Sequence, residues 1–262
     1  MKLDLQAELS EQLEIEEVFG FDLGSIHIGF DESTVVSWII IAVLTIVAII
    51  LTRNLKVTGK ISKRQQLLEF CYEKSVDFFK GILGPKVENF IPWLMSMALF
   101  IGVSNMMGLF GMKPPTKSMQ VTLAMALTSI VIIEYASIKD KGFIGRIKAF
   151  AKPTPIVAPI NILEILTKPL SLCMRLFGNI IGAFIIMELI KAIPVLKVGV
   201  PVVFSLYFDL FDALLQAYIF VFLTALYIQE AVEEEEEPAK DKQTKKMKKL
   251  SKKAKKKAAK TA

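Results

Sequence analysis

Long runs of apolar side chains dominate the sequence, and polar residues gather between them. Such runs indicate membrane-spanning helices, because about 20 apolar residues in a helix cross the roughly 30 Å hydrocarbon core of a bilayer. The pattern predicts an all-α polytopic membrane protein with five membrane-embedded helices. They are expected at about 35–52, 90–112, 119–138, 155–192 and 198–229.

A further segment, at about 56–80, has a different pattern. Apolar residues such as Leu67 and Phe70 are mixed there with charged ones such as Lys63 and Glu69. A stretch of this kind is suited to lying along the membrane surface, with its apolar face in the acyl region and its charges in water. We expect one interfacial amphipathic helix.

The last two apolar runs are longer than a bilayer requires. At 1.5 Å per residue, the fourth run of about 38 residues would reach about 57 Å as a helix, nearly twice the hydrocarbon thickness. Either both helices are steeply tilted or they are broken, and Pro169 is a candidate for a kink. We expect a long, strongly tilted helix pair.

The charges divide the chain into three parts and set its expected orientation. An acidic N-terminal segment (1–34) precedes the membrane domain (35–230), and a charged tail (231–262), expected to be disordered, follows it. The loops after the first and third spans are rich in Lys and Arg, whereas the other two loops carry two lysines each. By the positive-inside rule, the N-terminus is outside and the tail is cytoplasmic. The acidic start also argues against a cleavable signal peptide.

Composition narrows the possible functions. A content of 53% hydrophobic residues argues against a soluble domain. Cys71 and Cys173 lack metal or disulfide spacing and His27 has no companion, so no metal site or cofactor is expected. A phosphate-binding glycine loop is absent from the sequence. The lysine-rich tail is expected to meet membrane lipid or a partner's acidic surface, and its lack of aromatic residues argues against nucleic acid.

One arginine, Arg175, lies in the middle of the fourth run, within the stretch KPLSLCMRLFGN at 168–179. An arginine at the bilayer centre costs roughly 2.5–3.5 kcal/mol even on the lenient insertion scale, so a functional role is expected. At about 100° of rotation per residue, the polar and small residues of this helix lie on the same face as Arg175. They are Glu164, Lys168, Ser171, Gly178, Asn179 and Gly182. Gly178 and Gly182 form a small-xxx-small pair, which lets another helix come close beside the arginine.

The fifth run has a matching polar face, formed by Ser205, Asp209, Asp212 and Gln216. Two polar stripes, one cationic and one acidic, indicate a hydrated path for an ion. Glu164 lies toward the cytoplasm and Glu188 near the outer face, so carboxylates lie on both sides of one fixed positive charge. That charge would repel a cation in a low dielectric. The arrangement favours two half-channels separated by a barrier and served by a carboxyl group that moves on a partner.

A structural role remains open for two of these charges. Arg175 would be structural if it were paired with Asp209 or Asp212. Glu134, alone in the third run and near its inner end, is interpreted as structural or interfacial.

Two stretches carry a family resemblance: KPLSLCMRLFGN at 168–179 and FDALLQAYIFVFLTALYI at 211–228. Together with SNMMGL from Ser104 and PPTKSMQVTLAMAL from Pro114, they resemble subunit a of the F-type ATP synthase. The resemblance covers roughly residues 33 to 229. It implies a subunit of a bacterial cell membrane that is not catalytic alone and carries H⁺ or Na⁺ to a rotating ring of c subunits. The b-subunit peripheral stalk and the other subunits of the synthase are its further implied partners.

The resemblance also implies roles for single residues. Arg175 would be the essential arginine that faces the rotor carboxylates, with Asn179 as its motif partner and Gln216 as the glutamine of the last helix. Asp209 falls where relatives have Glu or His. Departures concern the outer route: Ala183 and Phe184 stand where relatives often have Gly followed by Glu or His, and Ser118 where many have Asp. Glu188 or Asp212 is the candidate replacement for the missing acid.

Two other functions are compatible with the pattern. A self-contained cation channel or secondary transporter, gated by an Arg–Asp pair, would predict internal repeats, and none is visible between the halves of the sequence. A lysine-tailed membrane anchor would make Arg175 dispensable.

Overall fold

The computed structural model describes residues 17–23, 26–56, 61–150, 158–193 and 199–233. The predictions for residues 1–16 and for the tail from 234 onward lie outside these ranges. The elements are β1 (Glu17–Leu23), β2 (Ile26–Asp31), α2 (Glu32–Thr52), α3 (Lys63–Leu83), η1 (Glu88–Phe90), α4 (Ile91–Met106), η2 (Met107–Phe110), η3 (Pro115–Lys117), α5 (Met119–Lys141), α6 (Phe143–Phe150), α7 (Ala158–Ala192), α8 (Val200–Ser205), η6 (Leu206–Asp212) and α9 (Ala213–Glu233).

Within the described ranges, five helical segments are long and apolar enough to cross a membrane, namely Glu32–Thr52, Glu88–Phe110, Met119–Lys141, Pro159–Lys191 and Val200–Val232. The predicted all-α polytopic membrane fold is therefore confirmed. The sequence did not predict the small antiparallel hairpin of β1 and β2 that precedes α2. Its alternating pattern is short and lies in a stretch that was interpreted only by its acidic charge.

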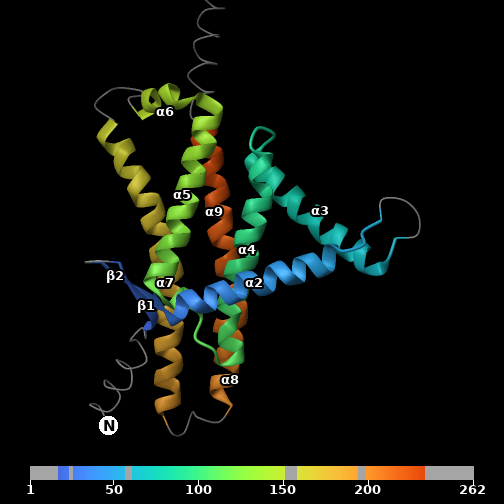
Figure 1. Cartoon of the computed structure of the whole chain (residues 1–262), viewed down its shortest axis with the longest axis vertical. Helices are drawn as coiled ribbons and strands as arrows, with labels where there is room; N and C mark the ends of the chain where they lie inside the picture. The colour runs from blue at the N-terminus through green and yellow to red at the C-terminus, as the bar shows by residue number, and fades with distance from the viewer. Residues whose placement is uncertain (1–16, 24–25, 57–60, 151–157, 194–198, 234–262) are drawn as a thin grey trace, which may run out of the picture.

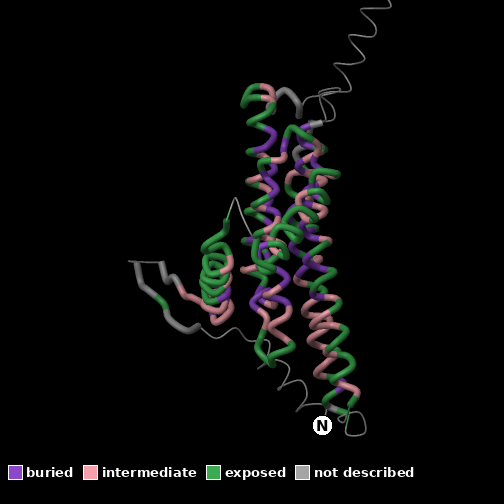
Figure 2. Tube along the Cα trace, turned by 90° about the vertical axis from the view of Figure 1, so that its right-hand side faces the viewer, coloured by how far each residue is buried: buried purple, intermediate pink, exposed green. Residues whose placement is uncertain are grey.

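Four of the helices form an elongated bundle (Figure 1). α9 packs against α4 and α5, and α7 packs along the other side of α5. α2 lies across the long axis of this bundle instead of along it, as Figures 1 and 2 both show. Because helices that cross in this way cannot all be parallel to one membrane normal, some of them must be inclined within the bilayer.

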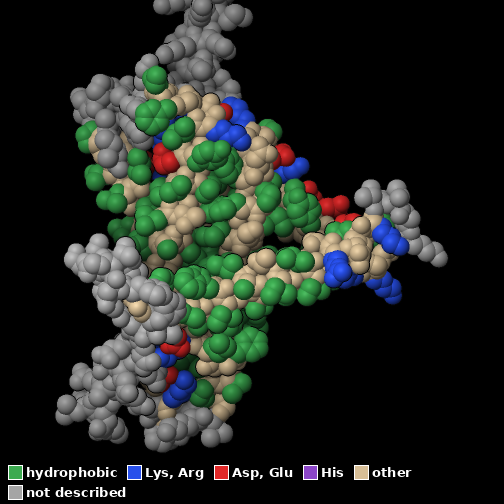
Figure 3. All heavy atoms as spheres, viewed as in Figure 1, with side chains coloured by type: hydrophobic (Ala, Val, Ile, Leu, Met, Phe, Trp, Pro, Cys, Tyr) green, Lys and Arg blue, Asp and Glu red, His purple; other side chains and the backbone are tan. Residues whose placement is uncertain are grey.

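The buried core runs along the centre of the bundle (Figure 2). Leu94 and Ile101 from α4, Ile133 from α5 and Phe220 from α9 are at most 2% exposed. The Ser137 hydroxyl donates a 3.2 Å hydrogen bond to the backbone oxygen of Ala231, which fastens α5 to the end of α9. Hydrophobic side chains also cover much of the outer face, and charges gather at the ends of the helices and around the α2–α3 junction (Figure 3). This distribution is the one expected of a bundle immersed in lipid.

The two long runs at the end of the chain differ in regularity. α7 is one continuous helix of 35 residues that includes Pro169, so the alternative of a fourth run broken at this proline is wrong. Its length corresponds to about 52 Å, well above the hydrocarbon thickness. The fifth run passes from α8 into α9 through the π-helical η6. A π-helical turn in a longer helix often marks a functional site, and here it contains Asp209 and Asp212.

Candidate functional site

Arg175 lies at the edge of the packed face of α7. Leu172, Cys173 and Leu176 are buried toward α5, and Thr122 of α5 contacts the Cys173 sulfur at 3.5 Å. Arg175 itself is half-buried, and Ser171, one turn before it, is exposed. The arginine therefore lies where the packed face of α7 meets its open face.

The open face of α7 includes both glycines of the small-residue pair. An added Cβ at Gly178 or at Gly182 would meet no heavy atom within 4 Å among the residues that the structure describes. Gly178 and Asn179 are exposed, as are Leu170 and Met174 on the same side. The close approach that the glycines permit is thus not made by the described part of this chain.

A direct hydrogen bond links α7 to α9 near the arginine. The Asn179 side-chain nitrogen donates to the Gln216 side-chain oxygen at 2.8 Å. Gln216 is 1% exposed, and its own Nε2 has no hydrogen-bond partner among the described residues. The structure therefore brings together two of the predicted site residues, from helices that make few other contacts with each other.

A cleft of about 820 Å³ opens beside Gln216. Its wall comes from the end of α4, η2, the η2–η3 connection, η3, α7, α8, η6 and the start of α9. All three acids predicted for the outer side line it, together with further polar residues: Glu188, Asp209, Asp212, Gln216, Asn105, Lys113, Lys117, Lys191 and Ser205. Asn105 is 5% exposed, and its Nδ2, like the Nε2 of Gln216, lacks a partner within the described ranges. The cleft thus combines carboxylates with buried amide donors.

Asp209 is held firmly in this cleft. The Ser205 hydroxyl donates a 2.5 Å hydrogen bond to its Oδ2. No ion pair or hydrogen bond joins Arg175 to Asp209 or Asp212 within the described part of the chain. The structural alternative, in which Arg175 is neutralised by one of these aspartates, is therefore not the arrangement seen.

Lysines surround the cleft on the side of η3. The Lys117 ammonium lies 3.6 Å from the centre of the Phe184 ring, which is a cation–π contact. Burial and, after it, the charge of Lys113 lower the pKa of Lys117 to about 8, against the raising effect of Glu188 and Glu32. Lys191 donates a 2.7 Å hydrogen bond to Glu188, whose side chain is 14% exposed.

A second charged cluster lies toward the other end of α7. The Lys168 ammonium is 3.0 Å from a carboxylate oxygen of Glu164 and 3.0 Å from one of Glu230 at the end of α9. It also lies 5.1 Å from the centre of the Tyr227 ring. The predicted residue Glu164 is thus far along the chain from the cleft beside Gln216 and belongs to a separate charged group.

Glu134 has a structural partner, in line with its interpretation from the sequence. Arg146 of α6 donates two hydrogen bonds of 2.9 and 2.8 Å to the two carboxylate oxygens of Glu134. The side chains of Arg146 and Glu134 are 11% and 25% exposed. This bidentate pair fastens α6 to α5 and leaves Glu134 out of both charged clusters.

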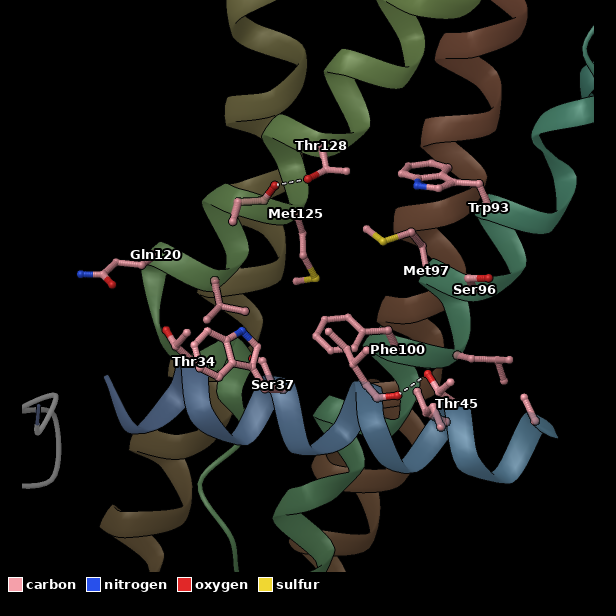
Figure 4. A pocket seen from close by; sticks show the side chains of 17 residues that line it. Thr34, Ser37, Thr45, Trp93, Ser96, Met97, Phe100, Gln120, Met125 and Thr128 are labelled. Carbon is pink, nitrogen blue, oxygen red and sulfur yellow. Dashed lines mark hydrogen bonds between the residues drawn. The ribbon is translucent and has the colours of Figure 1, made fainter. Parts of the chain in front are cut away.

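A second cleft, of about 720 Å³, lies between α2 and the helices α4 and α5 (Figure 4). No charged side chain of the described residues lines it. The hydroxyl groups of Ser37, Thr45 and Thr128 each donate at 2.7 Å to the backbone oxygen four residues earlier in their own helix. Most of the lining of this cleft is apolar, and it lacks the carboxylates of the cleft beside Gln216.

The comparison with protein families agrees with the geometry of the polar cleft. The family described as ATP synthase A chain matches residues 34–229, which contain Arg175, Asn179, Gln216 and every residue of the polar cleft. The chain belongs to this family. As an ATP synthase A chain, it is a multi-pass membrane protein and a membrane-sector subunit that works with the other subunits of the synthase.

Several residues of the site were not singled out from the sequence. Asn105 and Gly108 lie in SNMMGL, which was used only as a mark of resemblance, and Lys117 lies in a turn that was counted only for its charge. Glu230 follows the last apolar run and was not part of the polar face predicted for it. A signal for Asn105 was available, because an amide inside an apolar run is itself unusual.

Proposed function

We propose that this ATP synthase A chain is the stator subunit that conducts H⁺, or Na⁺, to and from the carboxylates of a rotating c-subunit ring. One observation carries the proposal. The polar cleft gathers Glu188, Asp209 and Asp212 and ends at the buried Gln216, which is hydrogen-bonded to Asn179, four residues after Arg175. We assign this cleft to the outer half-channel.

The open face of α7 supports a rotor partner. Leu170, Met174 and Gly178 are exposed on it, and Arg175 is half-buried beside them. A carboxyl group on the ring that passed this face would meet a positive charge, which favours its ionised form and the release of its ion. The same charge repels a free cation and so prevents a leak between the half-channels.

The cluster of Glu164, Lys168 and Glu230 supports the assignment of the inner half-channel to the opposite end of α7. Ser171 is exposed between this cluster and Arg175. With the outer cleft on one side of the arginine and this cluster on the other, the two routes are offset and meet only at the rotor face.

The orientation in the membrane is part of the proposal. If α2 spans the bilayer, α7 and α9 are strongly inclined, because α2 lies across them (Figure 1). A tilted α7 also accommodates its excess length. We place the N-terminus outside and the tail in the cytoplasm of a bacterial cell, with the b-subunit stalk and membrane lipid as further partners.

The alternative of a self-contained channel gated by an Arg–Asp pair finds little support. Arg175 has no ion pair with Asp209 or Asp212 within the described part of the chain. The rotor proposal needs such a free arginine, whereas the gate needs the pair.

The test is ATP-driven ion pumping in inverted vesicles that contain the assembled synthase with Arg175→Ala, with and without sodium. Arg53→Ala, at an exposed arginine that ends α2, is the matched control. We expect Arg175→Ala to abolish coupled pumping while the complex stays assembled and Arg53→Ala pumps normally. Dependence on sodium would identify the ion. Normal pumping by Arg175→Ala would refute the proposal.

A further inference from the structure

We propose that Gly108 is a positioning residue of the outer cleft, which leaves the space that the Asp209 carboxyl group needs in order to face the ion. The inference rests on the proposed function, because it assigns Asp209 to the ion path. Gly108 is in η2 and Asp209 in η6, two elements that contact each other and both contribute to the cleft wall.

A side chain at Gly108 would meet Asp209 before any other residue. A Cβ added at Gly108 would lie 2.5 Å from Oδ1, 2.7 Å from Cγ and 3.3 Å from Oδ2 of Asp209, and these are its three nearest atoms. Carbon atoms do not approach neighbours at 2.5 Å, so any side chain at position 108 forces the carboxyl group of Asp209 to move.

Backbone conformation does not explain this glycine. Positive φ angles occur at Gly84, Gly111, Gly142 and Gly199 among the described glycines, but not at Gly108. Alanine would fit the backbone of Gly108 without strain. The reason for glycine at this position is therefore the close approach of Asp209.

Asp209 has little freedom to yield. Ser205, one turn earlier, donates a hydrogen bond to its Oδ2, and the short aspartate side chain has only two rotatable bonds. Its carboxyl group thus lies between the Ser205 hydroxyl and η2. Moving it would break this hydrogen bond and turn the carboxyl group away from its place in the cleft wall.

The experiment compares variants in the assembled synthase. In Gly108→Ala, ATP-driven pumping should fall on the order of tenfold to a hundredfold, the usual effect of displacing a catalytically important group by about 1 Å. Gly102→Ala is the matched control, because its Cβ would meet only the Cβ of Ala217 at 3.8 Å, an ordinary contact. We expect it to pump at the wild-type rate.

A double variant moves the carboxyl group of this contact from η6 to η2. Gly108→Asp combined with Asp209→Ala places an acid where the Asp209 carboxyl now lies, from the opposite wall. The swap should restore much of the pumping that Gly108→Asp or Asp209→Ala loses alone. Relief of the steric clash alone would recover no more than the pumping of Asp209→Ala, so a swap no faster than Asp209→Ala would overturn the proposal, as would normal pumping by Gly108→Ala.

If Gly108→Ala does not assemble, the contact is tested by assembly itself. Gly108→Ala combined with Asp209→Ala removes the clash, so the complex should form again, and its continued absence would contradict the inference. Failure of the proposed function is separate from these outcomes, because it appears as normal pumping in Arg175→Ala.

Discussion

The Asn179 side chain donates a 2.8 Å hydrogen bond to Gln216, and this bond joins the helix of Arg175 to the wall of the outer cleft. Asn179 is exposed on the open face of α7, whereas Gln216 is 1% exposed. The pair therefore links the open face of α7 to the cleft. It fixes the relative position of two helices that have few other contacts.

Gln216→Leu should slow ATP-driven pumping while the complex remains assembled. Leucine keeps the volume of the buried side chain but removes the acceptor for Asn179 and the donor that Gln216 presents to the cleft. Combined with Asn179→Ala, the effects on pumping should be less than additive, with a coupling of about 0.5–3 kcal/mol. The measurement is the pumping rate per assembled complex for both single variants and the double variant. Strict additivity would show that the two residues act independently.

Glu134→Gln should destabilise the protein without changing its transport. The bidentate hydrogen bonds to Arg146 are mostly shielded from solvent, and losing a charged hydrogen bond of this kind costs about 1.5–3 kcal/mol. Thermal inactivation of the detergent-solubilised complex should occur at a lower temperature, with the pumping rate per intact complex unchanged.

A matched control for this prediction is Lys80→Met. It breaks the pair of Lys80 and Glu88, whose side chains are 47% and 40% exposed. Exposed pairs contribute little to stability, so the inactivation temperature should hardly move. An equal loss of stability in both variants would contradict the interpretation.

The Lys117 ammonium should make ion uptake depend on the pH at the cleft side. Its pKa is lowered to about 8, chiefly by burial, so it is positive below this pH and neutral above it. When positive, it repels a cation that enters the cleft beside Glu188, Asp209, Asp212, Lys113 and Lys191. Uptake in Lys117→Met, which is always neutral, should exceed the wild-type rate below pH 8 and match it above pH 9.

Lys117→Arg tests the same charge, but it should lower the rate of ion uptake at high pH instead of raising it at low pH. Arginine stays positive and keeps a cation over the Phe184 ring. Its rate of uptake should equal that of wild type below pH 8 and fall behind it above pH 9. The measurement is ATP synthesis in proteoliposomes at varied pH on the cleft side. Parallel pH profiles for the three proteins would exclude Lys117 from the ion path.

The sequence was most informative where burial in lipid decides the structure. The runs that predict α2, α4, α5, α7 and α9 are apolar because most of their side chains meet lipid or the protein core. The rotation of about 100° per residue also placed Asp209, Asp212 and Gln216 together, although η6 is π-helical and departs from that rotation. All three line one cleft because they lie within little more than two turns.

The hydropathy pattern does not predict contacts between segments that are distant in the sequence. Gly108 and Lys117 reach the cleft because η2 and η3 lie beside α7 and η6, which depends on how the helices pack. The crossing of α2 over the bundle is likewise set by packing, since hydropathy gives the length of a helix but not its tilt. Glu230 joins Glu164 and Lys168 only once α9 is placed beside α7.

Lys168→Met should impair transport more than Glu230→Gln does. Lys168 bridges Glu164 and Glu230 at 3.0 Å each, so its loss leaves two carboxylates facing each other without a positive charge. Glu230→Gln removes one of the two ion pairs and leaves the other intact. The measurement is the pumping rate together with the amount of assembled complex for each variant.

The double variant Lys168→Met with Glu230→Gln separates charge from packing. If repulsion between the carboxylates causes the defect, removing one of them should recover part of the transport lost in Lys168→Met. The methionine still fills the space beside the Tyr227 ring, so the loss of packing is the same in both backgrounds. A double variant no faster than Lys168→Met would show that repulsion between the two carboxylates does not cause the defect.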